Sequence, residues 1–325
     1  MRSAQPFSLC EIVTDFGTEF RPPFRFSGFP LTTEFDMDPP RPRPDCPLVV
    51  AYGLGVNSTA MLVEFAKRDI VPDMILFADT GGEKPETYRY MPVIEAYLKK
   101  VQFPPVVTVR YEPKTAPYRT LEGQCLHTGT LPSLAYGGKS CSLKFKRGPA
   151  DAHVLRHYPP AELISSGRRV VRAIGFDASE ERRTFAGVVK AIGLDAGEPH
   201  RLTWAKPKPD EPDRKPSREE RLDATFFTYY YPLVGWGMDR AACERSIRDA
   251  GLPVPMKSSC WFCPASKKKE IVWLREHHPE LLERALAIEA NAQPNLTSVV
   301  GLGRSFAWAD FLNALDDMPL FDCGG

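Results

Sequence analysis

Short apolar runs alternate with helical patterns along the first half of the chain. Three of these runs, residues 47–53, 73–79 and 104–111, are bounded by proline, glycine or charged residues and have the length of a buried strand. Amphipathic segments follow the first two runs, at residues 59–68 and 88–100. Buried parallel strands have continuous apolar runs because helices cover both faces of their sheet. The alternation therefore predicts an α/β fold with a doubly wound parallel sheet.

The second half of the chain continues this pattern and then becomes mainly helical. Residues 168–176 predict a fourth strand, and residues 226–236 return to a β-rich composition. An amphipathic helix is expected over residues 239–252, where Gly251 would cap its C-terminus. The further helices expected from the pattern span residues 267–276 and 279–292.

These patterns divide the chain into three parts. Residues 1–46 form a proline-rich arm. Because disordered segments contain few aromatic residues, its phenylalanines predict that the arm packs on the rest of the protein. The alternative is that the natural start is Met37. Residues 47–240 form an α/β domain that contains all the predicted strands. Residues 241–325 form a mainly helical, cysteine-containing C-terminal region.

The composition excludes several classes of protein. The formal net charge is +1, so no overall charge attracts the chain to nucleic acid or to a membrane, and a basic site must be local. No apolar run approaches the ~20 residues that span a bilayer, and the N-terminus does not resemble a secretory signal. We therefore expect a cytoplasmic protein without a membrane partner. In that compartment its 8 cysteines indicate metal binding or catalysis rather than disulfides.

The turn after the first predicted strand has the composition of an anion-binding loop. It comprises Gly53, Leu54, Gly55, Val56, Asn57, Ser58 and Thr59. Glycines let the backbone approach an anion closely, and the following helix offers unpaired N–H groups and the positive end of its dipole. Ser58 and Thr59 add hydroxyl donors. The turn matches neither a Walker A loop nor GxGxxG, and a capped helix after a tight turn is the alternative.

An acidic turn follows the second predicted strand. It comprises Asp79, Thr80, Gly81, Gly82, Glu83, Lys84, Pro85 and Glu86. Ligands of α/β proteins bind at the carboxyl ends of the strands, so we expect Asp79 and Glu83 on the same rim as the first turn. Because both would lie on a surface turn, replacing Asp79 should affect turnover more than stability. An acidic helix start is the alternative interpretation.

Together the two turns resemble the pyrophosphatase-loop superfamily, and within it the phosphoadenosine phosphosulfate reductase branch. GLGVNSTAML stands where members carry an SGGKDS-type loop, and FADTGGEKPETY is similar to their FxDTGxxxPET-type segment. Val56 replaces the lysine of that loop, as in the reductases of this branch. The segment from Gly175 to Arg183 and the group Tyr231-Pro232-Leu233, Trp236 and Asp239 resemble later motifs of the family.

This resemblance covers about residues 47–265 and implies a Rossmann-like, adenine nucleotide alpha-hydrolase-like fold. It implies binding of ATP or an adenylylsulfate-type nucleotide, with or without Mg²⁺. Ser58 would bind phosphate oxygens, and Asp79 would contact the nucleotide or Mg²⁺. Arg182 and Arg183 would neutralise developing charge on phosphate. The residues expected around the nucleotide are Gly53, Gly55, Asn57, Ser58, Thr59, Asp79, Thr80, Gly81, Glu83, Lys144 and Glu180.

Four cysteines form a candidate metal site. Cys260 and Cys263 have the CxxC spacing that lets two thiolates bind one ion, while Cys125 and Cys141 are single. Four thiolates suit zinc or a [4Fe–4S] cluster, and buried free thiols or a redox pair are the alternatives. Cluster-bearing members of the resembled superfamily include adenylylsulfate reductases and thiolating enzymes of transfer RNA and DNA. Some of these use three cysteines, which makes Cys125 the optional ligand.

Basic residues flank these cysteines. They are Lys139, Lys144, Lys146 and Arg147 around Cys141, and Lys267, Lys268 and Lys269 after the CxxC. A solvated surface is one interpretation of such runs, and a site facing phosphate groups is the other.

Two enzymatic hypotheses and one non-enzymatic hypothesis follow. In the first, ATP adenylates a substrate oxygen with release of pyrophosphate, and sulfur from a cluster, a cysteine or a sulfur-donor protein then displaces AMP from a tRNA, DNA or small-molecule acceptor. In the second, a sulfonucleotide reductase attacks sulfur with a C-terminal cysteine, for which Cys323 in DCGG is the candidate. The third is a non-catalytic nucleotide-binding protein with structural zinc.

Overall fold

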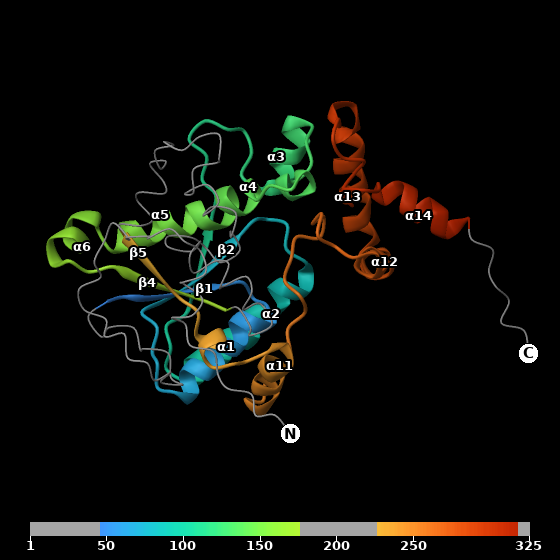
Figure 1. Ribbon diagram of the computed structural model, residues 1–325. Coiled ribbons are helices and arrows are strands. Elements are labelled where there is room, and N and C mark those ends of the chain that lie inside the picture. The colour runs from blue at the N-terminus through green and yellow to red at the C-terminus, as the bar shows by residue number, and fades with distance from the viewer. Residues whose placement is uncertain (1–45, 176–225, 318–325) are drawn as a thin grey trace, which may run out of the picture. The chain divides into compact units, whose positions relative to one another are not determined.

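The computed structural model describes residues 46–175 and 226–317 (Figure 1). The chain separates into two compact units, Met1–Asp36 and Met37–Gly325, and all described residues lie in the second. Its strands are β1 (Leu48–Tyr52), β2 (Met74–Asp79), β3 (Val106–Arg110), β4 (Val170–Ile174) and β5 (Phe227–Tyr230). Its helices are α1 (Val56–Lys67), α2 (Pro85–Lys100), α3 (Leu121–Thr128), α4 (Ser140–Ser142), α5 (Gly148–His157), α6 (Pro160–Ser166), α10 (Pro232–Gly235), α11 (Arg240–Asp249), α12 (Lys268–His277), α13 (Pro279–Ala292) and α14 (Trp308–Asp316). Short 3₁₀ turns span Ser133–Tyr136 and Gln293–Asn295, and Leu143–Arg147 is a π-helical turn.

The five strands form one parallel sheet in the order β3-β2-β1-β4-β5. The chain runs outward from β1 to β3 and returns to the other side of β1 with β4, so the order reverses between β1 and β4. Side chains of successive residues in a strand face opposite sides of the sheet. In β1, Val50 packs with α1, α2 and α11 in one core, whereas Val49 packs with α5 and α6 in another. Figure 1 shows these two groups of helices on opposite faces of the sheet. The predicted doubly wound α/β fold is confirmed.

Local sequence explains where the helices beside the sheet begin. Pro85 occupies the first turn of α2, where its missing N–H costs nothing. Thr120 caps α3 because its side chain accepts a hydrogen bond from the Gly123 N–H. Asp239 caps α11 in the same way through the Ala242 N–H. At the other end of α11, Gly251 has a φ of 76°, the left-handed conformation expected just beyond a helix.

The C-terminal region contributes to two different cores. Helix α11 packs on α1, and its Cys243 and Ile247 belong to the core on that face of the sheet. Helices α12, α13 and α14 instead pack with α3 in a separate core that contains Trp261, Phe262 and Trp308. Helix α11 thus belongs by its packing to the core beside the sheet, because α1 covers its amphipathic face.

The structure also contains helices that the sequence pattern did not predict. Helices α3 to α6 occupy the stretch between β3 and β4 that had no clear periodicity, and α14 lies beyond the two expected C-terminal helices. Most of these helices are short, so they present too few turns for a clear apolar stripe. No described helix has both the length and the apolar character needed to cross a membrane.

Gly175 lies where β4 and α1 approach each other closely, at the point where the strand order reverses. A Cβ at Gly175 would lie 2.8 Å from the backbone nitrogen of Ser58 and 2.9 Å from the carbonyl carbon and oxygen of Asn57. These are backbone atoms, which cannot turn aside. We expect Gly175→Ala to lower the free energy of unfolding by about 1–3 kcal/mol, the usual cost of overpacking. Urea unfolding curves would measure the change.

Gly53→Ala is the matched control for this substitution. A Cβ at Gly53 would meet no atom closer than 3.8 Å. Its unfolding curve should therefore stay close to that of the natural protein. Equal midpoints for the two alanine variants would show that β4 and α1 do not pack backbone to backbone.

Candidate functional site

The turn after β1 is held in shape by its own serine. Leu54 is fully buried with a φ of 56°, and Gly53 and Gly55 lie half-buried on either side of it. Ser58 Oγ donates to the Gly55 carbonyl at 3.2 Å and accepts from the Gly53 N–H at 3.3 Å. The hydroxyl expected to bind phosphate therefore also stabilises the turn.

The neighbouring polar residues of this turn point in other directions. Thr59 is fully buried and its hydroxyl lies 3.1 Å from the Tyr52 hydroxyl, so it faces the core. Asn57 Oδ1 accepts from Arg240 at the start of α11, at 3.4 Å. Ser258, which sequence reasoning missed, lies over the turn: a Cβ at Gly55 would come within 2.8 Å of its Oγ. The sequence around Ser258 gives no indication of this position, because its contact with Gly55 joins segments far apart in the chain.

Asp79 is buried, so the prediction that it lies on a surface turn is wrong. Its exposed fraction is 3%. Oδ1 accepts from the Gly81 N–H at 2.8 Å and from the Tyr88 hydroxyl at 2.7 Å, and Oδ2 accepts from Arg110 Nε at 2.9 Å. Side chains from α2 and the end of β3 close over the carboxylate. A nucleotide or Mg²⁺ at Asp79 would have to compete with these partners.

The same turn positions α3. Gly81 has a φ of 73°, and a Cβ there would lie 2.5 Å from the Thr120 side chain. The Leu121 N–H donates to the Thr80 carbonyl at 3.1 Å. Helix α3 and its Cys125 are therefore held against the carboxyl edge of the sheet.

The CxxC segment docks on this turn by its backbone. Glu83 and Cys260 form an antiparallel bridge, and the Trp261 N–H donates to the Gly82 carbonyl at 2.9 Å. Cys260 Sγ lies 3.2 Å from Thr80 Oγ1. Cys260 therefore lies directly against the acidic turn, a contact that the sequence did not predict.

The four candidate thiols belong to one apolar cluster. Cys125 and Cys260 are buried in it, and the half-buried Cys141 and Cys263 pack against it. All four are free cysteines. Cys141 is fixed by its backbone N–H, which donates to Ser133 Oγ at 2.9 Å. The fold brings together residues from α3, α4 and the CxxC segment.

Burial keeps three of these thiols neutral. Burial, with smaller contributions from Cys141 and Glu122, raises the pKa of Cys125 to about 12. Burial likewise raises the pKa of Cys260 and of Cys263. Smaller contributions to these shifts come from Cys263 at Cys260 and from Cys141 at Cys263. Thiolate is the metal-binding form, so a metal would have to displace these protons.

Two lysines lie next to the thiols. Lys146 Nζ donates to Glu83 Oε1 at 2.8 Å. Burial lowers the pKa of Lys146, but Glu83 and the cysteines Cys260 and Cys263 outweigh it and raise the pKa overall. Lys84 is only 4% exposed, and burial lowers its pKa. Both ammonium groups are placed to compensate negative charge on thiolates.

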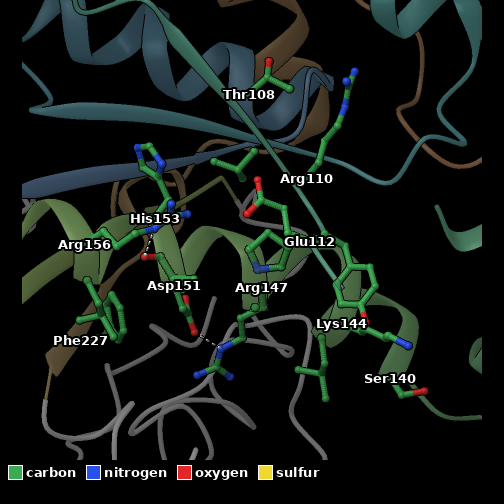
Figure 2. Close-up of a pocket in the computed structure, with 17 residues that line it drawn as sticks. Thr108, Arg110, Glu112, Ser140, Lys144, Arg147, Asp151, His153, Arg156 and Phe227 are labelled. Carbon is green, nitrogen blue, oxygen red and sulfur yellow. Dashed lines mark hydrogen bonds and ion pairs between the residues drawn. The ribbon is translucent and has the colours of Figure 1, made fainter. Parts of the chain in front are cut away.

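Lys144, expected near the nucleotide, is held by aromatic rings. Its Nζ donates to the Tyr118 hydroxyl at 2.8 Å and lies 5.0 Å from the Tyr111 ring centroid. It also lines a cleft of about 1210 Å³ beside β3 and α5, which Figure 2 shows with Lys144 and Ser140 at one end and Phe227 and Arg156 at the other. Of the other basic residues, Lys268 lies over the rings of Phe306 and Phe311 in the C-terminal core.

A smaller cavity of about 150 Å³ opens at the carboxyl ends of β1 and β2. Gly53, Ala78, Lys146 and Arg172 are among its lining residues. Arg172 is 5% exposed and pairs with Asp151 of α5. Sequence reasoning missed Arg172, although a charged residue within the apolar run of β4 is a visible signal. The cavity connects the turn after β1 with the lysine beside the cysteines.

Several predicted residues lie outside the described ranges. Glu180, Arg182 and Arg183 belong to residues 176–225, and Cys323 belongs to residues 318–325. Within residues 46–175 and 226–317, no group of three or more His, Cys, Asp or Glu side chains is arranged so that it could hold a metal ion. The roles assigned to these residues and to the four cysteines stay predictions.

Comparisons with known proteins give little further information. No family model matches the chain, and no curated protein matches its sequence. A similar solved structure is that of the U34-tRNA thiolase NcsA from Methanococcus maripaludis with its [4Fe-4S] cluster. The two share 12% sequence identity over 85% of this chain and 83% of that chain, with a TM-score of 0.34. Similarity at this level does not identify a shared activity.

The partners of Asp79 predict that it stabilises the fold. We expect Asp79→Asn to lower the free energy of unfolding by about 1–3 kcal/mol, because a buried hydrogen-bonded charge is lost and its donors lose a strong acceptor. Urea unfolding would measure this loss. Glu112→Gln, at an exposed position nearby, should change stability by less than about 0.5 kcal/mol. If the urea unfolding curves of Asp79→Asn and Glu112→Gln coincide, Asp79 does not stabilise the fold.

Proposed function

We propose that this protein is an adenine-nucleotide-dependent sulfur-transfer enzyme, similar to the phosphoadenosine phosphosulfate reductase-like branch of the pyrophosphatase-loop superfamily. ATP would activate a substrate oxygen by adenylation with release of pyrophosphate, and sulfur would then displace AMP. The observation that carries the proposal is the docking of Cys260 on the turn after β2, with Sγ 3.2 Å from Thr80 Oγ1. That turn lies at the carboxyl edge of the sheet, where α/β proteins bind their ligands. Sulfur chemistry and nucleotide chemistry would therefore take place side by side.

The turn after β1 would receive the phosphates. It leads directly into α1, whose first N–H groups and dipole favour an anion. Ser58 would keep the turn in its binding shape through its bonds to Gly53 and Gly55. The small cavity lined by Gly53, Ala78 and Lys146 supports a nucleotide position between this turn and the cysteines.

Cys141, Cys260 and Cys263 would hold the metal centre, with Cys125 as the candidate fourth ligand. The donor chemistry fits, because free thiols gather in one apolar cluster beside two buried or half-buried lysines. Four thiolates suit zinc or a [4Fe–4S] cluster, and the proposed sulfur transfer favours the cluster. Such a cluster would supply an iron site for binding the sulfur that is transferred.

The acceptor is proposed to carry phosphate groups. Arg110, Lys144 and Arg156 line the large cleft beside β3 and α5. Clustered cations of this kind bind the phosphates of nucleic acids. Of the acceptors considered, this favours tRNA or DNA over an uncharged small molecule. The reductase alternative depends on Cys323, outside the described residues, and the structural-zinc alternative predicts no turnover.

The metal centre can be tested by replacing single cysteines in protein purified without oxygen. Cys260→Ser should lower bound iron or zinc by more than about tenfold, because removing a ligand costs at least as much as removing the groups that orient one. Cys46→Ser is the matched control, since Cys46 is also a half-buried free thiol but packs against the core beside the sheet. Metal and sulfide analysis gives the readout. Metal-free natural protein would contradict the proposed centre.

Adenylation and sulfur transfer can be separated in one assay. The natural protein is incubated with labelled ATP, sulfide and either unfractionated tRNA or sheared DNA, and both pyrophosphate release and sulfur in the nucleic acid are measured. Gly55→Val should abolish both, because its side chain would meet Ser258 over the turn. Cys260→Ser should retain acceptor-dependent pyrophosphate release but lose sulfur incorporation. Sulfite formed from an adenylylsulfate without ATP would identify the reductase instead.

A further inference from the structure

The segment before the CxxC pair crosses the turn after β1. A Cβ at Gly55 would lie 2.8 Å from Ser258 Oγ, 3.6 Å from the Ser258 Cβ and 3.8 Å from its backbone nitrogen. A Cβ at Gly53 would lie 3.8 Å from the same hydroxyl. One serine from a distant part of the chain therefore lies against both glycines of the turn that is proposed to receive phosphates.

The fold does not use the Ser258 hydroxyl. Within residues 46–175 and 226–317, neither its Oγ nor its backbone N–H makes a hydrogen bond. The residue is half-buried, so the hydroxyl is within reach of a ligand. Ser58 differs in this respect, because its hydroxyl is bonded to Gly55 and Gly53 and holds the turn in shape. Of the two serines at the turn, Ser258 is the one whose hydroxyl can donate to a ligand without breaking a bond of the fold.

Helix α1 begins at this turn without a side-chain cap. Its N-cap residue is Gly55, no side chain caps it, and the first turn contains no acidic residue. The first N–H groups of a helix need acceptors from outside the helix, and Ser, Thr, Asp or Asn usually supply one. A phosphate oxygen at the turn would supply this acceptor. Ser258 Oγ already lies beside the N-cap residue, where such a phosphate would come within its reach.

The same segment carries a cysteine of the proposed metal centre. Cys260, two residues after Ser258, is bridged to Glu83, and its Sγ lies 3.2 Å from Thr80 Oγ1. Consecutive Cα atoms are about 3.8 Å apart, so the Cα atoms of Ser258 and Cys260 are separated by at most about 7 Å. The segment therefore contacts the turn after β1 through one residue and the turn after β2 through the other.

We propose that Ser258 is a nucleotide-binding residue whose hydroxyl donates to a phosphate oxygen held at the turn after β1. The inference rests on the proposed function, which assigns the phosphates of ATP to this turn. It adds a phosphate donor from the CxxC segment to those of the turn itself. It also links the two parts of the reaction, because a nucleotide bonded to Ser258 fixes the segment that carries Cys260.

Ser258→Ala tests the contact in the full-length protein. Isothermal titration calorimetry with ATP and Mg²⁺ should give a Kd about tenfold higher than that of the natural protein, because a hydrogen bond to a charged acceptor is lost. The urea unfolding midpoint should stay unchanged, since the hydroxyl has no partner among the described residues. A residue that acted only on the fold would change the midpoint.

Ser259→Ala is the matched control for this substitution. It removes a hydroxyl from the same half-buried segment, but Ser259 contributes none of the atoms nearest to Gly53 and Gly55. Its Kd for ATP should stay within about twofold of the natural value, as for most surface substitutions.

Hydrogen–deuterium exchange measures the link to the CxxC segment. At saturating ATP, residues 256–262 of the natural protein should exchange more slowly than without ATP, because the nucleotide holds the segment at Ser258. The slowing should be smaller in Ser258→Ala at saturating ATP.

Three results would overturn the inference while leaving the proposed function intact. They are equal ATP affinity in Ser258→Ala and the natural protein, a lowered urea midpoint in Ser258→Ala, and unchanged exchange of residues 256–262 when the natural protein binds ATP. Natural protein that binds neither ATP nor an adenylylsulfate would overturn the proposed function as well.

Discussion

The docking of the CxxC segment on the turn after β2 is the contact on which the rest of the candidate site depends. The Trp261 N–H reaches the Gly82 carbonyl at 2.9 Å, and Cys260 pairs with Glu83 across the bridge. Glycine is required at residue 82, because a Cβ there would lie 2.7 Å from the ring of Phe262. Together with the Leu121 N–H bond to the Thr80 carbonyl, this contact joins the core of α3 and α12–α14 to the carboxyl edge of the sheet. The two contacts hold the cysteines next to the turns that follow β1 and β2.

Buried carboxylates around this edge pair with cations that are partly or mostly exposed. Glu83 binds Lys146, and Asp79 binds Arg110. Solvent screens the exposed partner, so these pairs are weak evidence for stability. Their consequence here is geometric. Lys146 lines the small cavity and is held by Glu83, and Lys84 is buried nearby on the same turn. Positive charge is therefore in place before any thiol loses its proton.

The residues that carry the family resemblance have structural partners in this chain. Ser58 holds the turn after β1, Thr59 pairs with Tyr52 in the core, and Asp79 is closed over by Tyr88 and Arg110. Motif residues of this kind therefore stabilise the shape of the sheet edge in addition to any chemical role. Asp79 is buried because it has structural partners, and it can still take part in the reaction.

The sequence by itself determined the strands, the helices α1, α2 and α11 and the two turns at the sheet edge, because these features depend on apolar runs, periodicity and turn residues close together in the chain. It also identified the four cysteines, since their CxxC spacing and basic flanks are local. Only the tertiary structure decided that α11 packs with α1, that Ser258 lies over Gly55, and that Glu83 and Lys146 meet beside Cys260. The physical reason is that these contacts join residues distant along the chain, and the packing that brings them together leaves no pattern in the sequence around either partner.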